Sequence, residues 1–304
     1  MASYTIVLLS LFISCFSILL LSLTLSSVLL VSITTAGSFH QHININWGEE
    51  RAQILESGQL VTLTLDQYSG SGFQSKDEYL FGRIDVQLKL VSGDSAGTVT
   101  AFYLSSQGPA HDEIDFEFLG NVSGEPYIVH TNMYTEGHAG REEQFYLWFD
   151  PRQDFHTYSI IWNPGRVIWL VDDIPIREYT NHGSKGVPYP SRRPMRLYSS
   201  IWNADSWATQ NGKIKTDWTK APFTASYRNL KIDACVWEST SSCESEESTN
   251  SPPSKPWMKQ QLDDGGKMNL QWVRKKYMVY DYCVDYKKFV YGIPLECKLR
   301  KMPG

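Results

Sequence analysis

The chain has 304 residues, a formal net charge of -5 and 42% hydrophobic residues, and its ten Trp and seventeen Tyr make it rich in aromatic side chains. A chain of this length and hydrophobicity buries a sizeable core in one large domain or two small ones, which excludes a collagenous or disordered protein. Its mild acidity argues against electrostatic binding to nucleic acid, so we expect no nucleic-acid partner.

The N-terminal segment is apolar and uncharged. Glu49 is the first charged side chain, and residues 6–33 are almost wholly Leu, Ile, Val, Phe and Ser. Small residues at 34–38 are typical of a cleavage site, so residues 1–37 are interpreted as a signal peptide. The leader lacks a basic start and is long enough to cross a bilayer, so an uncleaved anchor is the alternative. Either interpretation puts the rest of the chain outside the cytosol, with no membrane contact once the leader is cleaved.

Four cysteines remain when Cys15 of the leader is set aside, and all lie in the last 70 residues. Separations of eight and fourteen residues favour local disulfides, Cys235 with Cys243 and Cys283 with Cys297. A metal site is the rival interpretation, but the cysteines have no Cys-x-x-Cys spacing and no paired histidines near them. We therefore expect no metal at these cysteines, and no motif of the chain implies a cofactor.

Short alternating segments dominate residues 58–235. In residues 81–91, Ile84, Val86 and Leu88 fall on one face and charged or polar side chains on the other, which is typical of a half-buried strand. Turn-forming residues separate similar segments at 60–65, 98–104, 114–119, 144–149, 157–162, 167–171 and 194–201. This pattern predicts an all-β sandwich or jelly roll over residues 38–237, and the lack of helical periodicity before residue 255 argues against alternating βα units.

The remaining residues, 238–304, are expected to form a C-terminal extension stapled to the sandwich by disulfides. Residues 238–256 are rich in Ser, Glu and Pro and predict an exposed loop. Residues 258–262 and 268–282 fit a short helix, a strand or both, and the pattern does not distinguish them.

The chemistry lies in residues 111–120, which read HDEIDFEFLG. In a strand, the period of two places Glu113, Asp115 and Glu117 on one face with His111, and apolar side chains on the other. Three carboxylates in a row repel one another, which is unfavourable in a strand that has only a structural role. Their presence together therefore favours a catalytic function. A solvated acidic strand or a calcium site is the alternative.

The spacing of the two glutamates favours a glycosidase. Their Cα atoms lie about 13 Å apart along a strand, and leaning side chains leave roughly 5 Å between the carboxyls of Glu113 and Glu117. That gap suits a retaining enzyme, because an inverting one needs about 6.5–9.5 Å to admit water. Asp115, between them, couples to both. The spacing does not say which glutamate is the nucleophile and which the acid.

Residues 111–120, together with the glycosylation triplet Asn121-Val122-Ser123, resemble the signature of the xyloglucan endotransglucosylase/hydrolase proteins of plant cell walls, members of glycoside hydrolase family 16. The resemblance spans roughly residues 40–300, including segments 146–151, 160–164 and 200–204 and the cysteine-bearing tail. It implies a curved β-jelly-roll sandwich whose concave face forms an open cleft for a branched β-1,4-glucan. It also implies a location in the cell wall and apoplast and a glycan on Asn121. We expect the protein to be a monomer.

The resemblance assigns the catalytic roles. Glu113 corresponds to the nucleophile, Glu117 to the acid/base, and Asp115 to a group that assists the nucleophile. The glycosyl group then passes from Glu113 to a sugar hydroxyl or to water, which frees the carboxylate, so the expected partners are a xyloglucan donor and a xyloglucan acceptor. The family consists mostly of transferases.

The resemblance also implies substrate contacts. Trp202 and Trp207 would stack on sugar faces, whereas Trp162 and Trp169 alternate within apparent core strands. Three of the expected positions depart from the family pattern: Ser206 and Asn211 replace an acid and a glycine near the acceptor side, and Lys288 stands where the family tends to have Arg. The full expected set is His130, Thr131, Asn132, Gly140, Arg141, Glu142, Trp202, Ser206, Trp207, Asn211 and Lys288.

Three alternatives stay open at this stage. A predominantly hydrolytic xyloglucanase would differ in loops that hold the acceptor. An enzyme of the same fold acting on mixed-linkage β-glucan would differ in substrate. A sugar-binding module without catalysis would be indifferent to replacement of Glu113 by Gln.

Overall fold

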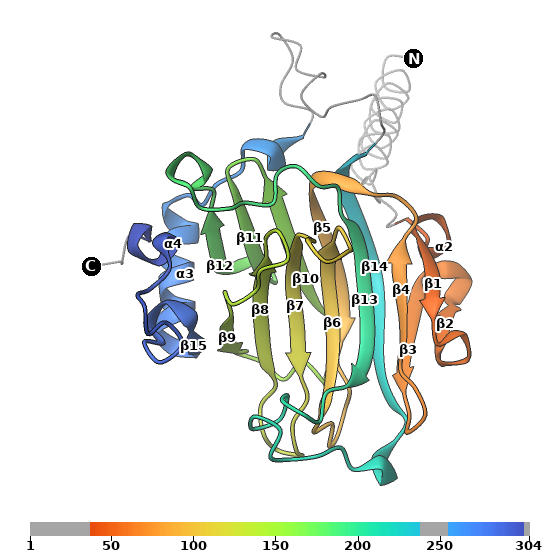
Figure 1. Cartoon of the computed structure of the whole chain (residues 1–304). Helices are drawn as coiled ribbons and strands as arrows, with labels where there is room; N and C mark the ends of the chain where they lie inside the picture. The colour runs from red at the N-terminus through yellow and green to blue at the C-terminus, as the bar shows by residue number, and fades with distance from the viewer. Residues whose placement is uncertain (1–36, 238–254, 301–304) are drawn as a thin grey trace, which may run out of the picture. The chain divides into compact units, whose positions relative to one another are not determined.

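Fifteen strands form two antiparallel sheets in the computed structural model, which describes residues 37–237 and 255–300 (Figure 1). All of these residues fall in one compact unit, Gly37–Gly304. The expected leader, apart from Gly37, and Cys243 lie outside the described residues. In the described ranges, no helix has the length and apolar character needed to span a bilayer.

Each sheet follows one order of neighbouring strands. The eight-stranded sheet runs β1 (Ile43–Trp47), β4 (Ser71–Ser75), β13 (Arg196–Asn203), β6 (Thr98–Ser105), β7 (Glu113–Leu119), β8 (Ile128–Tyr134), β9 (Glu143–Tyr146) and β15 (Met278–Asp281). The seven-stranded sheet runs β12 (Ile174–Thr180), β11 (Arg166–Val171), β10 (His156–Asn163), β5 (Tyr79–Lys89), β14 (Phe223–Val236), β3 (Leu60–Leu65) and β2 (Ala52–Leu55). Within residues 37–237 and 255–300, the α-helices are α2 (Phe39–His42), α3 (Asp264–Tyr277) and α4 (Leu295–Leu299).

The expected all-β jelly-roll sandwich is confirmed. Each of the eight strand segments expected from the sequence contains a strand, although β9 ends at Tyr146, earlier than expected. The ambiguous segment 268–282 is both helix and strand, because α3 passes directly into β15. Several strands were not expected, among them β8, because its residues do not alternate between apolar and polar types.

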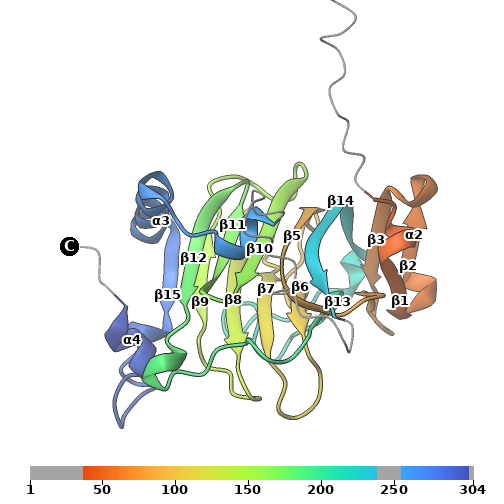
Figure 2. The same ribbon diagram turned by 90° about the horizontal axis from the view of Figure 1, so that it is seen from above.

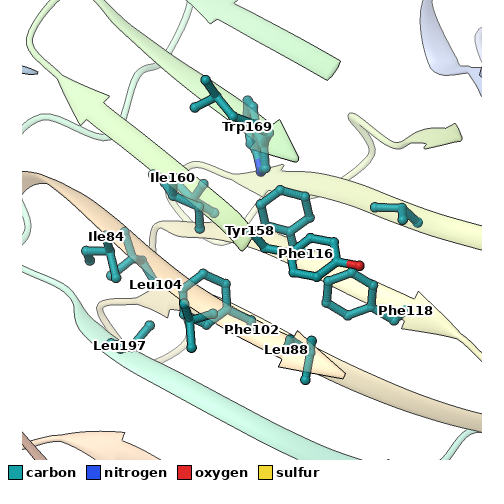
Figure 3. Packing of buried hydrophobic residues seen from close by; sticks show 14 of the residues in the cluster. Ile84, Leu88, Phe102, Leu104, Phe116, Phe118, Tyr158, Ile160, Trp169 and Leu197 are labelled. Carbon is teal, nitrogen blue, oxygen red and sulfur yellow. The ribbon is translucent and has the colours of Figure 1, made fainter. Parts of the chain in front are cut away.

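The core lies between the two sheets, where large aromatic side chains interlock (Figure 3). Phe116 and Phe118 point inward from β7, and both rings meet the ring of Tyr158 on β10 edge to face, at centroid distances of 5.8 and 4.6 Å. All three side chains are fully buried. Edge-to-face contacts of this kind add to the hydrophobic stabilisation of a core. This packing fixes which face of β7 points outward.

The C-terminal extension is integrated into the sandwich. Strand β15 pairs with β9 and so completes the eight-stranded sheet, while α3 packs along β12 at the edge of the other sheet. Figure 2 shows these elements at one end of the sandwich, with β1 and β2 at the opposite end. The 3₁₀ helix Pro256–Lys259 packs on β10, where the Asn163 side chain donates to the carbonyl of Trp257.

The disulfide between Cys283 and Cys297 is present as expected. It links the segment that follows β15 to α4. Cys235 is also disulfide-bonded, and its expected partner, Cys243, is not among the described residues.

A buried ion cluster joins the extension to the sandwich. Glu143 on β9 is fully buried and accepts hydrogen bonds from Arg274 of α3 at 2.8 Å and from Arg300 at 2.6 Å. A third guanidinium, that of the fully buried Arg177, lies 3.9 Å away, and Asp281 also pairs with Arg274 and Arg300. Burial alone would raise the pKa of Glu143, but the charges of the three arginines hold it below its usual value.

Replacing Glu143 by Gln is expected to destabilise the protein by about 3–5 kcal/mol, because it removes the negative charge that compensates buried guanidinium groups. The free energy of unfolding from denaturant titration measures the effect. The control is Asp264→Asn, which breaks an exposed pair with Lys267 and is expected to cost less than about 1 kcal/mol. Equal losses in the two variants would contradict a structural role for the buried cluster.

Candidate active site

Three carboxylates lie on the outer face of β7, in the middle of the eight-stranded sheet. Glu113, Asp115 and Glu117 alternate along the strand with Ile114, Phe116 and Phe118, all of which are fully buried in the core. We call the three acidic residues the carboxylate row. The expected alternation of β7 is confirmed, and it arises because the apolar side chains can be buried only on the inner face.

The neighbouring strands surround the carboxylate row with polar and aromatic side chains. On β8, Tyr134 lies opposite Glu113, Asn132 opposite Asp115 and His130 opposite Glu117. On β6, Ser105, Tyr103 and Ala101 lie opposite the same three carboxylates. Residues directly opposite each other share a face of the sheet, so all of these side chains border the site.

Burial raises the pKa of each carboxyl in the row. Burial, with the negative charges of Glu113 and Glu142, raises the pKa of Glu117 to about 7. Burial, with the charges of Glu113 and Glu117, holds the pKa of Asp115 well above its usual value. Burial also raises the pKa of Glu113. Because each ionised carboxylate makes the next ionisation harder, the row holds protons at pH values where isolated carboxyls are ionised.

Two histidines face the outer carboxylates. His130 Nε2 lies 3.7 Å from an oxygen of Glu117, and the Gln144 amide donates to His130 Nδ1. That bond leaves the proton of the neutral ring on Nε2, directed at Glu117. Burial lowers the pKa of His130 to about 4, so the ring is neutral at physiological pH. At the other end, His111 Nε2 lies 3.9 Å from Glu113.

The site is supported from inside the core. The indole N–H of Trp169 donates to the backbone carbonyl of Asp115 at 2.9 Å, and the Arg177 guanidinium stacks over the same indole at 4.7 Å. Arg177 also donates to the carbonyl and to the hydroxyl of Thr131 on β8. These bonds tie β11 and β12 of the seven-stranded sheet to the backbone of the two strands that carry the site.

The residues expected to contact substrate separate into distinct groups. His130 and Asn132 lie on the outer face of β8 beside the carboxylate row. Thr131 is not brought to that face, because it is fully buried and its hydroxyl bonds to Arg177 and to the carbonyl of Glu143. The alternation of a strand forces this separation between adjacent residues.

The remaining expected contacts on this side involve the C-terminal extension. Arg141 donates to Glu296 of α4 at 2.9 Å. Glu142, whose charge acts on Glu117, forms an ion pair with Lys288. Gly140, at a φ of 104°, lies beside the Lys288 side chain: a Cβ there would lie 3.7 Å from Lys288 Cε and Nζ. The extension therefore reaches the border of the candidate active site.

Two tryptophans border the end of the row at Glu117. The ring of Trp207 lies 6.0 Å from that of His130 and 6.1 Å from that of Trp202, and both indoles are partly buried. Ser206 and Asn211 lie exposed in the same loop. Trp162 and Trp169 are fully buried, as their alternation within strands predicted.

Sequence reasoning missed the tyrosines of the site. Tyr103 on β6 and Tyr198 on β13 stack at 5.3 Å, next to Asp115, and Tyr134 on β8 stacks with His111 at 5.0 Å. The alternation of residues along β6 places Tyr103 on one face of the strand. Only the register between strands shows that the carboxylates lie on the same face. Asn121 lies in the turn after β7, where its side chain donates to the carbonyl of Pro126.

Two protein families match this chain, and together they cover most of its length. The family described as glycosyl hydrolases family 16 matches residues 39–220, and the family described as the xyloglucan endo-transglycosylase (XET) C-terminus matches residues 252–297. Xyloglucan endotransglucosylase protein 1 of Diospyros kaki is 56% identical over 289 residues, 95% of this chain and 97% of that protein. Xyloglucan endotransglucosylase/hydrolase protein 24 of Arabidopsis thaliana is 56% identical over 263 residues, 86% of this chain and 91% of that protein.

Solved structures share the fold at much lower identity. A prokaryotic beta-1,3-1,4-glucanase (lichenase) from a mouse hindgut metagenome matches with a TM-score of 0.52 at 24% identity, over 66% of this chain and 98% of that one. Crh5 transglycosylase matches with a TM-score of 0.54 at 25% identity, over 66% and 81%. From the two family matches and the closely similar relatives, we conclude that this chain belongs to glycosyl hydrolase family 16 and, within it, to the xyloglucan endotransglucosylase/hydrolase proteins.

Proposed function

We propose that this protein is a retaining xyloglucan endotransglucosylase, which cleaves the β-1,4-glucan backbone of xyloglucan and transfers the new end to another xyloglucan chain. The observation that carries the proposal is the carboxylate row on β7, with Glu113 and Glu117 on one face and Asp115 buried between them. The relatives named for xyloglucan endotransglucosylase activity, which match most of this chain, support the choice of substrate.

In this mechanism Glu113 is the nucleophile and Glu117 the general acid. A pKa of about 7 lets Glu117 carry a proton at neutral and mildly acidic pH, while Glu113 attacks the anomeric carbon and Glu117 protonates the departing glycosidic oxygen. Asp115 assists the nucleophile Glu113, and burial raises the pKa of Asp115. The products of this step are a glycosyl ester on Glu113 and a shortened glucan with a free hydroxyl.

The second step reverses the role of Glu117. Forming the ester removes the negative charge of Glu113, which is one of the causes that raise the pKa of Glu117. The pKa of Glu117 therefore falls when the intermediate forms, and the same carboxyl becomes able to take the proton of the incoming hydroxyl. A sugar hydroxyl as acceptor gives transfer, and water gives hydrolysis.

An acceptor saccharide that is bound next to the glycosyl ester favours transfer over hydrolysis. Trp202 and Trp207 flank the Glu117 end of the row, and Lys288, Glu142 and His130 offer polar groups nearby. A saccharide held there attacks the ester from a fixed position, which gives it an advantage over bulk water. Predominant hydrolysis is the competing outcome at the same intermediate.

We also propose that the protein acts outside the cell, in the cell wall and apoplast, as a glycosylated monomer. The apolar uncharged leader, the disulfide between Cys283 and Cys297 and the position of Asn121 in a partly exposed turn support this location. The proposed architecture is a signal peptide over residues 1–37, a catalytic domain over 38–237 and an extension over 238–304.

Glu113→Gln is expected to lower activity by about 10³-fold or more, because an amide cannot form the glycosyl ester. The assay follows fluorescent xyloglucan oligosaccharide entering polymeric xyloglucan, and new reducing ends, in the same sample. Label incorporation without new reducing ends supports transfer, and new reducing ends with little incorporation support hydrolysis. The control is Glu125→Gln, the same chemical change at an exposed position.

Wild-type activity on mixed-linkage glucan but not on xyloglucan would overturn the proposed substrate.

Glu142→Gln is expected to move the alkaline limb of the kcat/KM profile to lower pH. The general acid must be protonated, so activity falls as pH rises through the pKa of Glu117, about 7. Removing the negative charge of Glu142 makes the carboxylate of Glu117 easier to form and lowers that pKa. Glu136→Gln, at an exposed position, is the control and should leave the limb in place. A limb that stays or moves to higher pH in Glu142→Gln would contradict the assignment of Glu117.

Protein secreted from a eukaryotic host is expected to begin near residues 37–40 and to lose mass on treatment with an N-glycosidase. Ser123→Ala should abolish the mass loss, because it destroys the acceptor triplet while leaving the Asn121 side chain and its bond to Pro126 intact. Mass spectrometry measures both results. Retention of residues 1–36 in membrane-bound protein would instead support an uncleaved anchor.

A further inference from the structure

Trp47 is a large aromatic side chain of the eight-stranded sheet for which the catalytic mechanism has no use. It ends β1, at the edge of the sheet, and its side chain is 37% exposed. A bulge between Ile45 and Trp47 shifts the register, so that Trp47 lies opposite Gly72 of β4. Single exposed apolar side chains are common on protein surfaces, so the interest of Trp47 lies in what it is aligned with.

The indole lies on the outer face of β4. Phe73 is fully buried in the core, so its neighbour Gly72 faces outward. A Cβ on Gly72 would lie 2.4 Å from Nε1 of Trp47, and a Cβ on Gly70 would lie 3.0 Å from its Cη2. The ring therefore rests across two glycines, and the absence of side chains at both positions is what lets it lie there.

The same register links Trp47 to the carboxylate row. Five neighbouring strands, β1, β4, β13, β6 and β7, each contribute one residue to a line across the outer face of the sheet. These residues are Trp47, Gly72, Ser200, Ala101 and Glu117. The line covers four strand spacings, about 19 Å.

The middle of this line is lined by small side chains. The indole covers Gly72, and the small side chains of Ser200 and Ala101 leave the sheet surface low between the indole and Glu117. The adjacent line of residues carries the stacked rings of Tyr198 and Tyr103, which rise beside it. The line is thus a shallow strip of small residues with the rings of Tyr198 and Tyr103 on one side and the indole of Trp47 at its end. Such a surface is suited to an extended chain of pyranose rings, whose C–H faces are apolar and whose edges are polar.

We propose that Trp47 is a stacking platform for a glucosyl residue of the β-1,4-glucan backbone, several residues away from the bond that is cleaved. The inference rests on the proposed function, since the occupant is the same polysaccharide that reaches Glu117. Asn44 and Gln74, opposite each other on the same face beside Trp47, offer amide groups for the sugar hydroxyls. The platform extends recognition to long chains and selects them over short ones.

The test compares chain lengths. Trp47→Ala is expected to raise KM about 3- to 10-fold for xyloglucan long enough to span the four strands, and to leave KM for short oligosaccharides unchanged. Trp47→Phe retains an aromatic face and should recover much of the loss. The control is Trp272→Ala, which removes an indole of similar exposure, 40%, from α3.

Separate series in which only the donor or only the acceptor is lengthened identify the chain that reaches Trp47. A length-dependent rise in KM in either series supports the platform and assigns it to that chain. Equal changes for long and short chains, or no change in either series, would overturn it.

The proposed function is tested independently by activity of the wild type on xyloglucan. If that activity is absent, calorimetric titration of wild type and Trp47→Ala with long and short β-1,4-gluco-oligosaccharides still decides whether the indole binds glucan. Tighter binding of the long oligosaccharide by the wild type alone would support the platform, and equal affinities would overturn it.

Discussion

The packing of Phe116 and Phe118 against Tyr158 is the contact on which the candidate site depends. It buries the inner face of β7 between the two sheets and thereby forces Glu113, Asp115 and Glu117 to the outer face. A shift of one residue in this strand would bury three carboxylates and expose two phenylalanines, which no compact arrangement of these residues tolerates. The apolar half of the motif thus positions the acidic half, and the hydrogen bond from Trp169 to the Asp115 carbonyl holds the strand from the core side.

Once the carboxylates share a face, their electrostatics follow from crowding and loss of water. Burial raises the pKa of every member of the row, and mutual repulsion adds to the effect at Asp115 and Glu117. A proton is therefore available at Glu117 near neutral pH, where an isolated glutamate has none. The neutral state of His130 belongs to the same environment, because burial that favours a protonated carboxyl disfavours a protonated imidazole.

The C-terminal extension belongs to this electrostatic arrangement. Its Arg274 and Arg300 neutralise the buried Glu143 on β9, next to the strand that carries His130. On the outer side, Lys288 pairs with Glu142, whose charge acts on Glu117. Strand β15 extends the sheet itself. The extension is therefore a structural part of the candidate site, and its removal would expose the edge of β9 and take away two of the three arginines around the buried Glu143.

The strands with clear alternation, the outward face of β7 and the local disulfide between Cys283 and Cys297 could be predicted from the sequence, because each depends on residues close together in the chain. The sequence also placed Trp162 and Trp169 in the core. Which strands lie beside β7 follows only from the tertiary structure, and this arrangement brings Tyr103, Tyr134 and Tyr198 to the carboxylates. The tertiary structure likewise sets Trp47 in line with Glu117 and joins Glu143 to arginines more than a hundred residues away. Which strands pair, and in which register, depends on contacts between distant parts of the chain and on bulges within the strands. The periodicity of a single segment contains no information about either.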